Sequence, residues 1–217
     1  MDIPTDLKAA VMARIDSGAA SAVWTPADFL DLHGRGAVDK TLQRLVKAGT
    51  VRRIDRGLYD KPSLNHLTKQ DNSPDPREVI EAVARRDQIR VLVDGMTAAN
   101  DLGLTNAVPA KIIVHTDARL KAIKLGNLSI TFKQAAASKL YWAGRPAMRV
   151  VQALHWLRDT IAVSDDEDGW RRRLAALLAD PTQGQRLRDD LADGMSALPA
   201  WMQALLRPML GAEASAL

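Results

Sequence analysis

The chain has 217 residues, a formal net charge of +4 at pH 7 and no cysteine. The lack of cysteine excludes a disulfide framework and thiolate metal sites. Hydrophobic residues make up 47% of the chain and charged residues 26%, as is usual for a soluble globular protein of one or two domains. Residues 1–18 resemble an amphipathic helix rather than a signal peptide, and no apolar run approaches the roughly 18 residues of a membrane span. We therefore expect a cytoplasmic protein that makes no membrane contact.

The N-terminal region predicts three helices joined by short turns. Apolar residues recur at helical spacing over residues 5–17. Thr25 and Asp28 then fit a variant of the capping box at the start of a short helix over residues 26–32. The following HGRG has two glycines and predicts a tight turn. A third helix over residues 36–48 carries an apolar stripe.

Two short strands follow the third helix. Residues 51–54 and 58–59 are expected to pair around a tight turn at Asp55-Arg56-Gly57. Two helices joined by a glycine turn make a helix-turn-helix, and the hairpin behind them makes it a winged variant. We assign this winged helix-turn-helix domain to residues 1–62 and expect a DNA-binding role for it.

The rest of the chain predicts a linker and a second domain. Residues 63–76 are polar and rich in proline, which is typical of a linker. Residues 77–217 predict a mixed α/β segment, with a hairpin turning at Gly126-Asn127, followed by a C-terminal helical region from about residue 146. The expected fold class is therefore α+β.

Positive charge is concentrated in the predicted winged helix. Residues 33–61 hold eight basic and three acidic side chains, a net charge of +5, whereas the whole chain carries only +4. Side chains of the third helix are placed to contact base edges of DNA, and the arginines of the hairpin are placed to contact phosphates or a minor groove. The candidate DNA-binding residues are Arg35, Ala37, Lys40, Thr41, Gln43, Arg44, Lys47, Arg52, Arg53 and Arg56.

Other interpretations of these charges stay open. A basic face of this kind also occurs on solvated structural domains, and winged helices also serve as protein-interaction modules. The run Arg171-Arg172-Arg173 is either a second contact to phosphate or an acidic partner, or a solvated helix face paired with the acids before it.

No motif for catalysis or metal binding is found. The four histidines lack metal-ligand spacing, and the chain has neither a P-loop nor a G-x-S-x-G elbow. The acidic run over residues 165–168 lacks the alternating ligands of an EF-hand loop and suits the start of a helix instead. We therefore expect a protein that is not an enzyme, with no catalytic residues, no metal and no cofactor.

Three stretches of the sequence resemble a known family. The stretch TPADFLDLHGRGAVDKTLQRLVKAGTVRRIDRGLYDKP is similar to the N-terminal winged helix of AbiEi-type antitoxins of type IV, abortive-infection toxin–antitoxin systems. The stretches TAANDLGLTNAVPAKIIVHTD and AIKLGNLSITFK resemble the middle segment of the same family. The resemblance implies an antitoxin that binds inverted repeats in its own promoter, represses the operon and counteracts a cognate nucleotidyltransferase toxin. It carries the DNA-reading role to Lys40, Gln43, Arg44, Arg52, Arg53 and Arg56. It leaves open whether a dimer or two monomers fill the operator.

Overall fold

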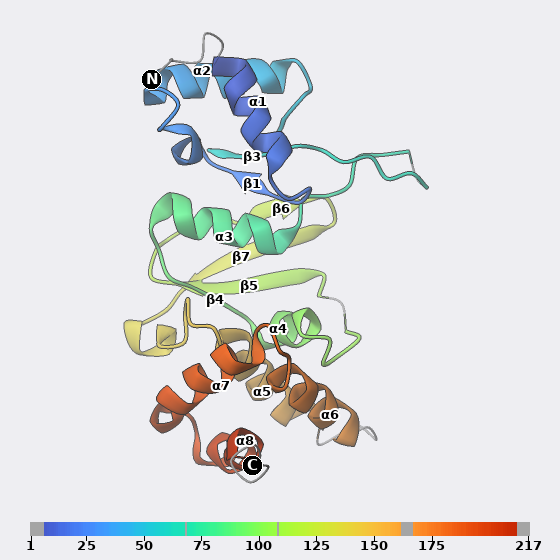
Figure 1. Ribbon diagram of the computed structural model, residues 1–217, viewed down its shortest axis with the longest axis vertical. Coiled ribbons are helices and arrows are strands. Elements are labelled where there is room, and N and C mark those ends of the chain that lie inside the picture. Colours follow the sequence, from blue (N-terminus) through green and yellow to red (C-terminus); the bar gives the residue numbers. More distant parts are fainter. Residues whose placement is uncertain (1–6, 68, 108, 162–166, 212–217) are drawn as a thin grey trace. The chain divides into compact units, whose positions relative to one another are not determined.

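The computed structural model describes residues 7–67, 69–107, 109–161 and 167–211. The protein is of the α+β class: its described residues form α-helices, an antiparallel three-stranded sheet and a four-stranded sheet (Figure 1). The chain folds into two compact units. Unit 1 comprises residues 1–89 and 122–130, and unit 2 comprises residues 90–121 and 131–217.

Unit 1 begins with a small helical bundle and a three-stranded sheet. Its strands are all antiparallel and lie in the order β1-β3-β2. The two-residue strand β1 was not predicted, because its partner β3 lies 35 residues further along the chain. The elements up to residue 89 are α1 (Leu7–Ser17), β1 (Val23–Trp24), the 3-10 helix η1 (Pro26–Phe29), α2 (Arg35–Lys47), β2 (Arg52–Asp55), β3 (Leu58–Asp60) and α3 (Pro76–Asp87).

The predicted start of η1 and end of α2 are both confirmed. The carboxylate of Asp28 accepts hydrogen bonds from the backbone N–H of Thr25 at 2.6 Å and from its hydroxyl at 3.0 Å. At the end of α2, the Gly49 N–H donates to the Val46 carbonyl at 3.0 Å and the next N–H donates to the Leu45 carbonyl at 3.1 Å. This is a Schellman motif, and it requires the left-handed φ of +70° that Gly49 adopts.

One apolar cluster holds the N-terminal elements of unit 1 together. It joins α1, η1, α2 and the sheet through the buried side chains Val11, Ile15, Phe29, Val38, Leu42, Leu45, Val51 and Tyr59. The helix α3 packs against β1 and β3, and the Arg85 guanidinium donates to the Val23 carbonyl at 3.0 Å. The predicted second domain started with this helix, so the observed division differs from the predicted one.

The remaining elements belong mostly to unit 2. The strands β4 to β7 form a sheet in the order β4-β5-β7-β6. The predicted hairpin is present as β6 and β7, with Gly126 in its turn at a φ of +62°. The bounds are β4 (Val91–Val93), α4 (Gly95–Asp101), β5 (Lys111–Thr116), β6 (Ile123–Leu125), β7 (Leu128–Gln134), η2 (Ala137–Leu140), α5 (Met148–Ile161), α6 (Glu167–Leu178), α7 (Gly184–Asp193), η3 (Met195–Ala197) and α8 (Ala200–Gly211).

Asp94 and Gly95 fix how α4 packs in unit 2. The Asp94 carboxylate caps α4 by accepting from the Thr97 N–H at 3.0 Å, and it also accepts from the Ile113 N–H of β5 at 2.8 Å. A Cβ on Gly95 would lie 2.5 Å from Cβ of Trp156, so only glycine lets α4 approach α5 this closely.

A charge cluster joins α7 to the segment ahead of α5 in unit 2. Arg145 binds Asp190 through Nε at 3.0 Å and Asp193 through Nη2 at 2.6 Å. Its guanidinium carbon also lies 4.9 Å from the ring centroids of both Tyr141 and Trp142. The helices predicted over this region are confirmed. Residues 165 and 166 of the predicted acidic run lie outside the described residues.

Within the described ranges, no helix is long and apolar enough to cross a membrane.

Two glycine-to-alanine changes in and beside α2 should have opposite effects on stability. Gly49→Ala places a side chain in the left-handed region and should lower the free energy of unfolding by about 1 kcal/mol. Gly36→Ala, at an exposed helical position with nothing within 4 Å of the added Cβ, should raise it by about 0.5 kcal/mol. Urea unfolding followed by circular dichroism measures both changes. A destabilised Gly36→Ala protein would contradict this account.

Candidate nucleic-acid interface

The helix α2 has a buried side and a cationic side. Val38, Leu42 and Leu45 are fully buried in the core of unit 1. With about 3.6 residues per turn, positions 40, 43, 44 and 47 fall on one stripe about 100° wide that faces away from this core. The exposed side chains of this stripe are Lys40, Gln43, Arg44 and Lys47. We call these four residues the α2 stripe.

None of the α2 stripe side chains is hydrogen-bonded or ion-paired to another described residue. This sets them apart from six other cations of unit 1, each of which has a carboxylate partner within 4.0 Å. Those pairs are Arg14 with Asp31, Arg35 with Asp39, Arg52 with Asp60, Lys61 with Asp16, Arg85 with Asp28 and Arg86 with Asp87. Carboxylates therefore neutralise the cations that hold unit 1 together, while the charge of the α2 stripe stays available to an anionic partner.

The β2–β3 hairpin adds two more cations. Arg53 and Arg56 are exposed. Arg53 makes one long bond of 3.3 Å, from Nε to the Asp55 carbonyl, and the Arg56 side chain has no partner among the residues the structure describes. The turn between the strands consists of Arg56 and Gly57, and Gly57 has a φ of +69°. Both guanidinium groups are free to reach a ligand.

Arg52 has a structural role instead. Its Nε donates to the Asp60 carboxylate at 2.9 Å and its Nη1 donates to the Asn72 carbonyl at 2.9 Å. The hydrogen bond to Asp60, only 5% exposed, raises the pKa of Arg52. Because Asp60 is buried, removing Arg52 would leave an unpaired buried carboxylate, which is strongly destabilising.

The ten predicted DNA-binding residues thus divide into two groups. Six are exposed and without a carboxylate partner: Lys40, Gln43, Arg44, Lys47, Arg53 and Arg56. The other four are placed differently. Arg35 is exposed but paired with Asp39, Arg52 is paired with Asp60, Ala37 is half-buried and Thr41 is only 6% exposed on the core side of α2.

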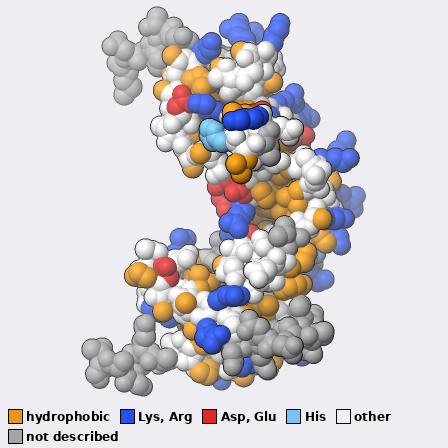
Figure 2. Space-filling model, turned by 90° about the vertical axis from the view of Figure 1, so that its right-hand side faces the viewer, with side chains coloured by type: hydrophobic (Ala, Val, Ile, Leu, Met, Phe, Trp, Pro, Cys, Tyr) orange, Lys and Arg blue, Asp and Glu red, His pale blue; other side chains and the backbone are white. Residues whose placement is uncertain are grey.

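Figure 2 shows lysine and arginine side chains on the surface at the end that holds α1 and α2 in Figure 1, as well as on other parts of this face. Guanidinium and ammonium groups that are exposed and have no carboxylate partner bind phosphates, because the contact releases condensed counterions from the nucleic acid.

Arg86 of α3 holds the hairpin turn in place. Its Nη1 donates to the Arg56 carbonyl at 2.5 Å, and its Cδ would lie 3.4 Å from a Cβ built on Gly57. The guanidinium is itself held by Asp87, and this hydrogen bond raises the pKa of Arg86. This contact was not predicted, because α3 was assigned to the second domain. The only sequence signal for it was a pair of arginines at the end of an amphipathic helix.

A bidentate ion pair positions the segment ahead of α2. Arg14 of α1 donates from Nη1 and Nη2 to the two carboxylate oxygens of Asp31, at 2.6 and 2.7 Å. Nη1 also donates to the Asp28 carbonyl at 2.6 Å. The hydrogen bond from Arg14 lowers the pKa of Asp31. The pair ties α1 to the turn from which α2 starts.

The chain belongs to a protein family described as a family of unknown function, DUF6088, whose model matches residues 10–180. Among solved structures, the crystal structure of RV2827C protein from Mycobacterium tuberculosis is similar over 94% of this chain and 82% of that one, with 19% identity and a TM-score of 0.41. No curated protein matches the chain. The described residues hold no group of three or more histidine, aspartate or glutamate side chains that could bind a metal ion.

The Arg14–Asp31 pair should make stability depend on pH. A carboxyl group with a lowered pKa in the folded state stabilises the fold above its unfolded pKa, and this contribution is lost as the pH falls through the lower folded value. Asp31→Asn should therefore lower the urea midpoint at about pH 7, and the difference from the wild type should shrink as the pH falls below the ordinary aspartate range and the wild-type carboxyl takes up its proton. Asp39→Asn, which removes an exposed pair within α2, is the control with the smaller expected effect. A difference that persists in acid would contradict this role.

The contact from Arg86 predicts a local change in the hairpin. Arg86→Met keeps the packing of the stem but removes the hydrogen bond to the Arg56 carbonyl, so the backbone amides of residues 56–58 should exchange with solvent several-fold faster. Arg85→Met is the matched control, because Arg85 binds the Val23 carbonyl instead. Equal exchange rates at residues 56–58 in the wild type and Arg86→Met would show that α3 does not hold the turn.

Proposed function

We propose that this protein is an antitoxin and transcriptional autorepressor that binds inverted repeats in its own promoter and counteracts a cognate nucleotidyltransferase toxin. The observation that carries the DNA-binding part is the division of charges in unit 1. The cations of the α2 stripe and the hairpin turn have no carboxylate partner, whereas the cations that support the fold are paired.

The order of elements supports a winged helix-turn-helix. The order α1, β1, η1, α2, β2, β3, with strands in the order β1-β3-β2, is the arrangement of a winged helix with α2 as its recognition helix. The 13 residues of α2 make a rod about 20 Å long. A B-DNA major groove about 12 Å wide accepts such a helix.

The exposed residues suit two kinds of contact with DNA. Lys40, Gln43 and Arg44 lie in the first ten residues of α2, where side chains of a recognition helix reach base edges. Arginine and lysine bind guanine, and glutamine binds adenine. Lys47 and the hairpin residues Arg53 and Arg56 suit phosphates, which position the protein without reading sequence.

The antitoxin part of the proposal rests on the resemblance of three sequence stretches to AbiEi-type antitoxins, two of which lie in the segment that starts at residue 97. In this proposal, unit 1 binds the operator and the remainder of the chain acts against the toxin. The alternative is a protein-interaction module that neutralises its partner by direct contact through the same cationic surface, without operator binding.

Loss of α2 stripe and hairpin arginines should weaken operator binding. In gel-shift titrations on the DNA upstream of its own operon, Arg44→Ala should cost about 1–3 kcal/mol and relax base preference at one position. Arg53→Ala should weaken binding to all sequences and reduce the salt slope by about one. Lys124→Ala, which removes an exposed cation from β6 of unit 1, should change neither quantity. Undiminished binding by a folded Arg44→Ala/Arg53→Ala protein would refute the assignment.

Co-purification with the product of the neighbouring gene separates the proposal from its alternative. A repressor that is also an antitoxin should bind operator DNA with a strong salt dependence, and its co-expression should relieve growth arrest by a nucleotidyltransferase. A direct-contact module should instead capture the partner and show no preference for operator DNA over unrelated duplex. In that case Arg44→Ala should weaken partner capture, because the same cation would meet the acidic partner.

A further inference from the structure

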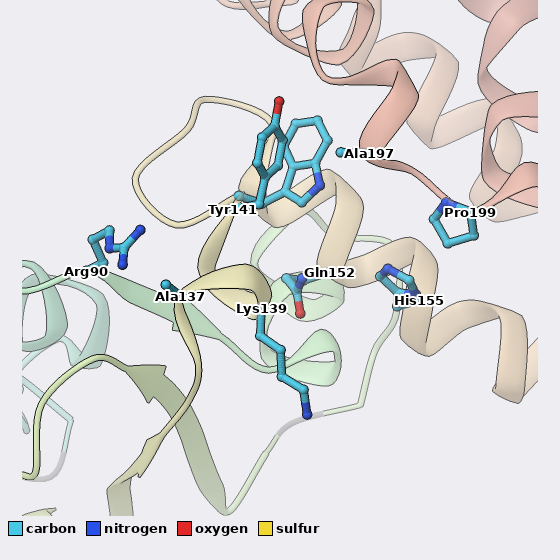
Figure 3. Close-up of a pocket in the computed structure, with 9 residues that line it drawn as sticks. Arg90, Ala137, Lys139, Tyr141, Gln152, His155, Ala197 and Pro199 are labelled. Atoms are coloured by element: carbon cyan, nitrogen blue, oxygen red, sulfur yellow. The ribbon is translucent and has the colours of Figure 1, made fainter.

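Unit 2 contains a cavity of about 670 Å³ that the proposed DNA interface does not use. Its volume falls within the range of about 300–1,000 Å³ that is usual for ligand sites. Four separate segments line it, as Figure 3 shows: the residue before β4, the η2 region, α5 and the turn from η3 to α8. The lining residues are Arg90, Ala137, Lys139, Tyr141, Trp142, Gln152, His155, Ala197 and Pro199.

The charged groups of this cavity are cations with free donors. Asp117 holds Arg90 through Nε at 3.2 Å, and the two terminal nitrogens of Arg90 have no partner in the described part of the chain. The exposed Lys139 likewise has no ion pair or side-chain hydrogen bond there. None of the lining residues carries a carboxylate. Asp117 balances the charge of Arg90, so the excess positive charge of the lining comes from Lys139 while Arg90 adds free donors, and this combination favours an anion.

The positive charge of Lys139 also affects the pKa of a histidine in the strand β5. The pKa of His115 in β5 is lowered, first by burial and then by the positive charges of Lys133 and Lys139, with Asp94 opposing them weakly. Binding an anion beside Lys139 would reduce this repulsion.

The other side of the cavity offers aromatic and amide groups. Tyr141 is 43% exposed, and its hydroxyl accepts a hydrogen bond from Arg145 at 3.0 Å, which leaves its own proton to donate. Trp142 beside it is buried. Figure 3 shows Tyr141 on the side of the cavity away from the Lys139 ammonium, with Gln152 between the two. The Gln152 amide has no hydrogen-bond partner among the described residues, so its donor and acceptor are both available.

We propose that this cavity binds a nucleoside phosphate, with the phosphates on Arg90 and Lys139 and the base against Tyr141 and Gln152. A guanidinium fork fits phosphate oxygens in a bidentate manner. Lysine adds a point charge on a flexible stem. A base stacks on an exposed aromatic ring, and an amide pairs with its mixed donor and acceptor edge. An acidic peptide would use the two cations and leave Tyr141 and Gln152 without polar partners.

Calorimetric titration of the full chain with ATP and CTP, one purine and one pyrimidine nucleotide, tests this site in the absence of DNA. At least one of the two should bind more tightly than both tripolyphosphate and the corresponding nucleoside. Arg90→Gln and Lys139→Gln should each raise Kd by at least about tenfold, as expected for a lost charge-assisted hydrogen bond. Lys121→Gln, an exposed cation of unit 2 that does not line the cavity, is the matched control and should leave Kd unchanged.

Several results would overturn the inference. These are the absence of binding by both nucleotides at millimolar concentration, binding of tripolyphosphate as tight as that of the nucleotide, and an undiminished affinity in the folded Arg90→Gln/Lys139→Gln protein. Thermal melting confirms that each variant is folded. Because the titration contains no DNA and the variants lie outside unit 1, the outcome is independent of whether the proposed operator binding holds.

Discussion

The packing of α2 against α1 and η1 determines what unit 1 presents to solvent. Once Val38, Leu42 and Leu45 are buried, the period of the helix fixes Lys40, Gln43, Arg44 and Lys47 on the opposite side. No additional side-chain contact is needed to orient these four residues. The Arg14–Asp31 pair and the Schellman end at Gly49 then fix where α2 starts and stops. The cationic surface is thus a consequence of the apolar core.

Local rules predicted the features that depend on neighbouring residues. The capping box at Thr25, the end of α2 at Gly49 and the turn at Gly126 follow from side-chain oxygens close to backbone N–H groups and from positive φ angles. The α2 stripe was also predictable from local sequence, because the spacing of apolar residues shows which side of a helix faces outward.

Features that depend on residues far apart in the chain were not predicted. Thr41 is an exception, because its local spacing from Val38, Leu42 and Leu45 already places it on the core side of α2, and its assignment to the interface overlooked this. Arg52 resembles a phosphate ligand, but Asp60 pairs with it across the hairpin. The strand β1 and the contact from Arg86 to the turn each join segments about 30 residues apart or more. The cavity of unit 2 draws its lining from four segments, so no single stretch of sequence marks it.

Unit 1 is built from two separate segments of the chain, which affects both its folding during synthesis and its isolation as a fragment. Residues 122–130 belong to it although residues 90–121 intervene. A ribosome must therefore complete the β6–β7 turn before every residue of this unit is available to fold. A shortened chain ending at residue 89 would carry all of the basic helix and hairpin and still lack part of the compact body that supports them. No single cut in the polypeptide therefore separates a complete unit 1 from the rest of the chain.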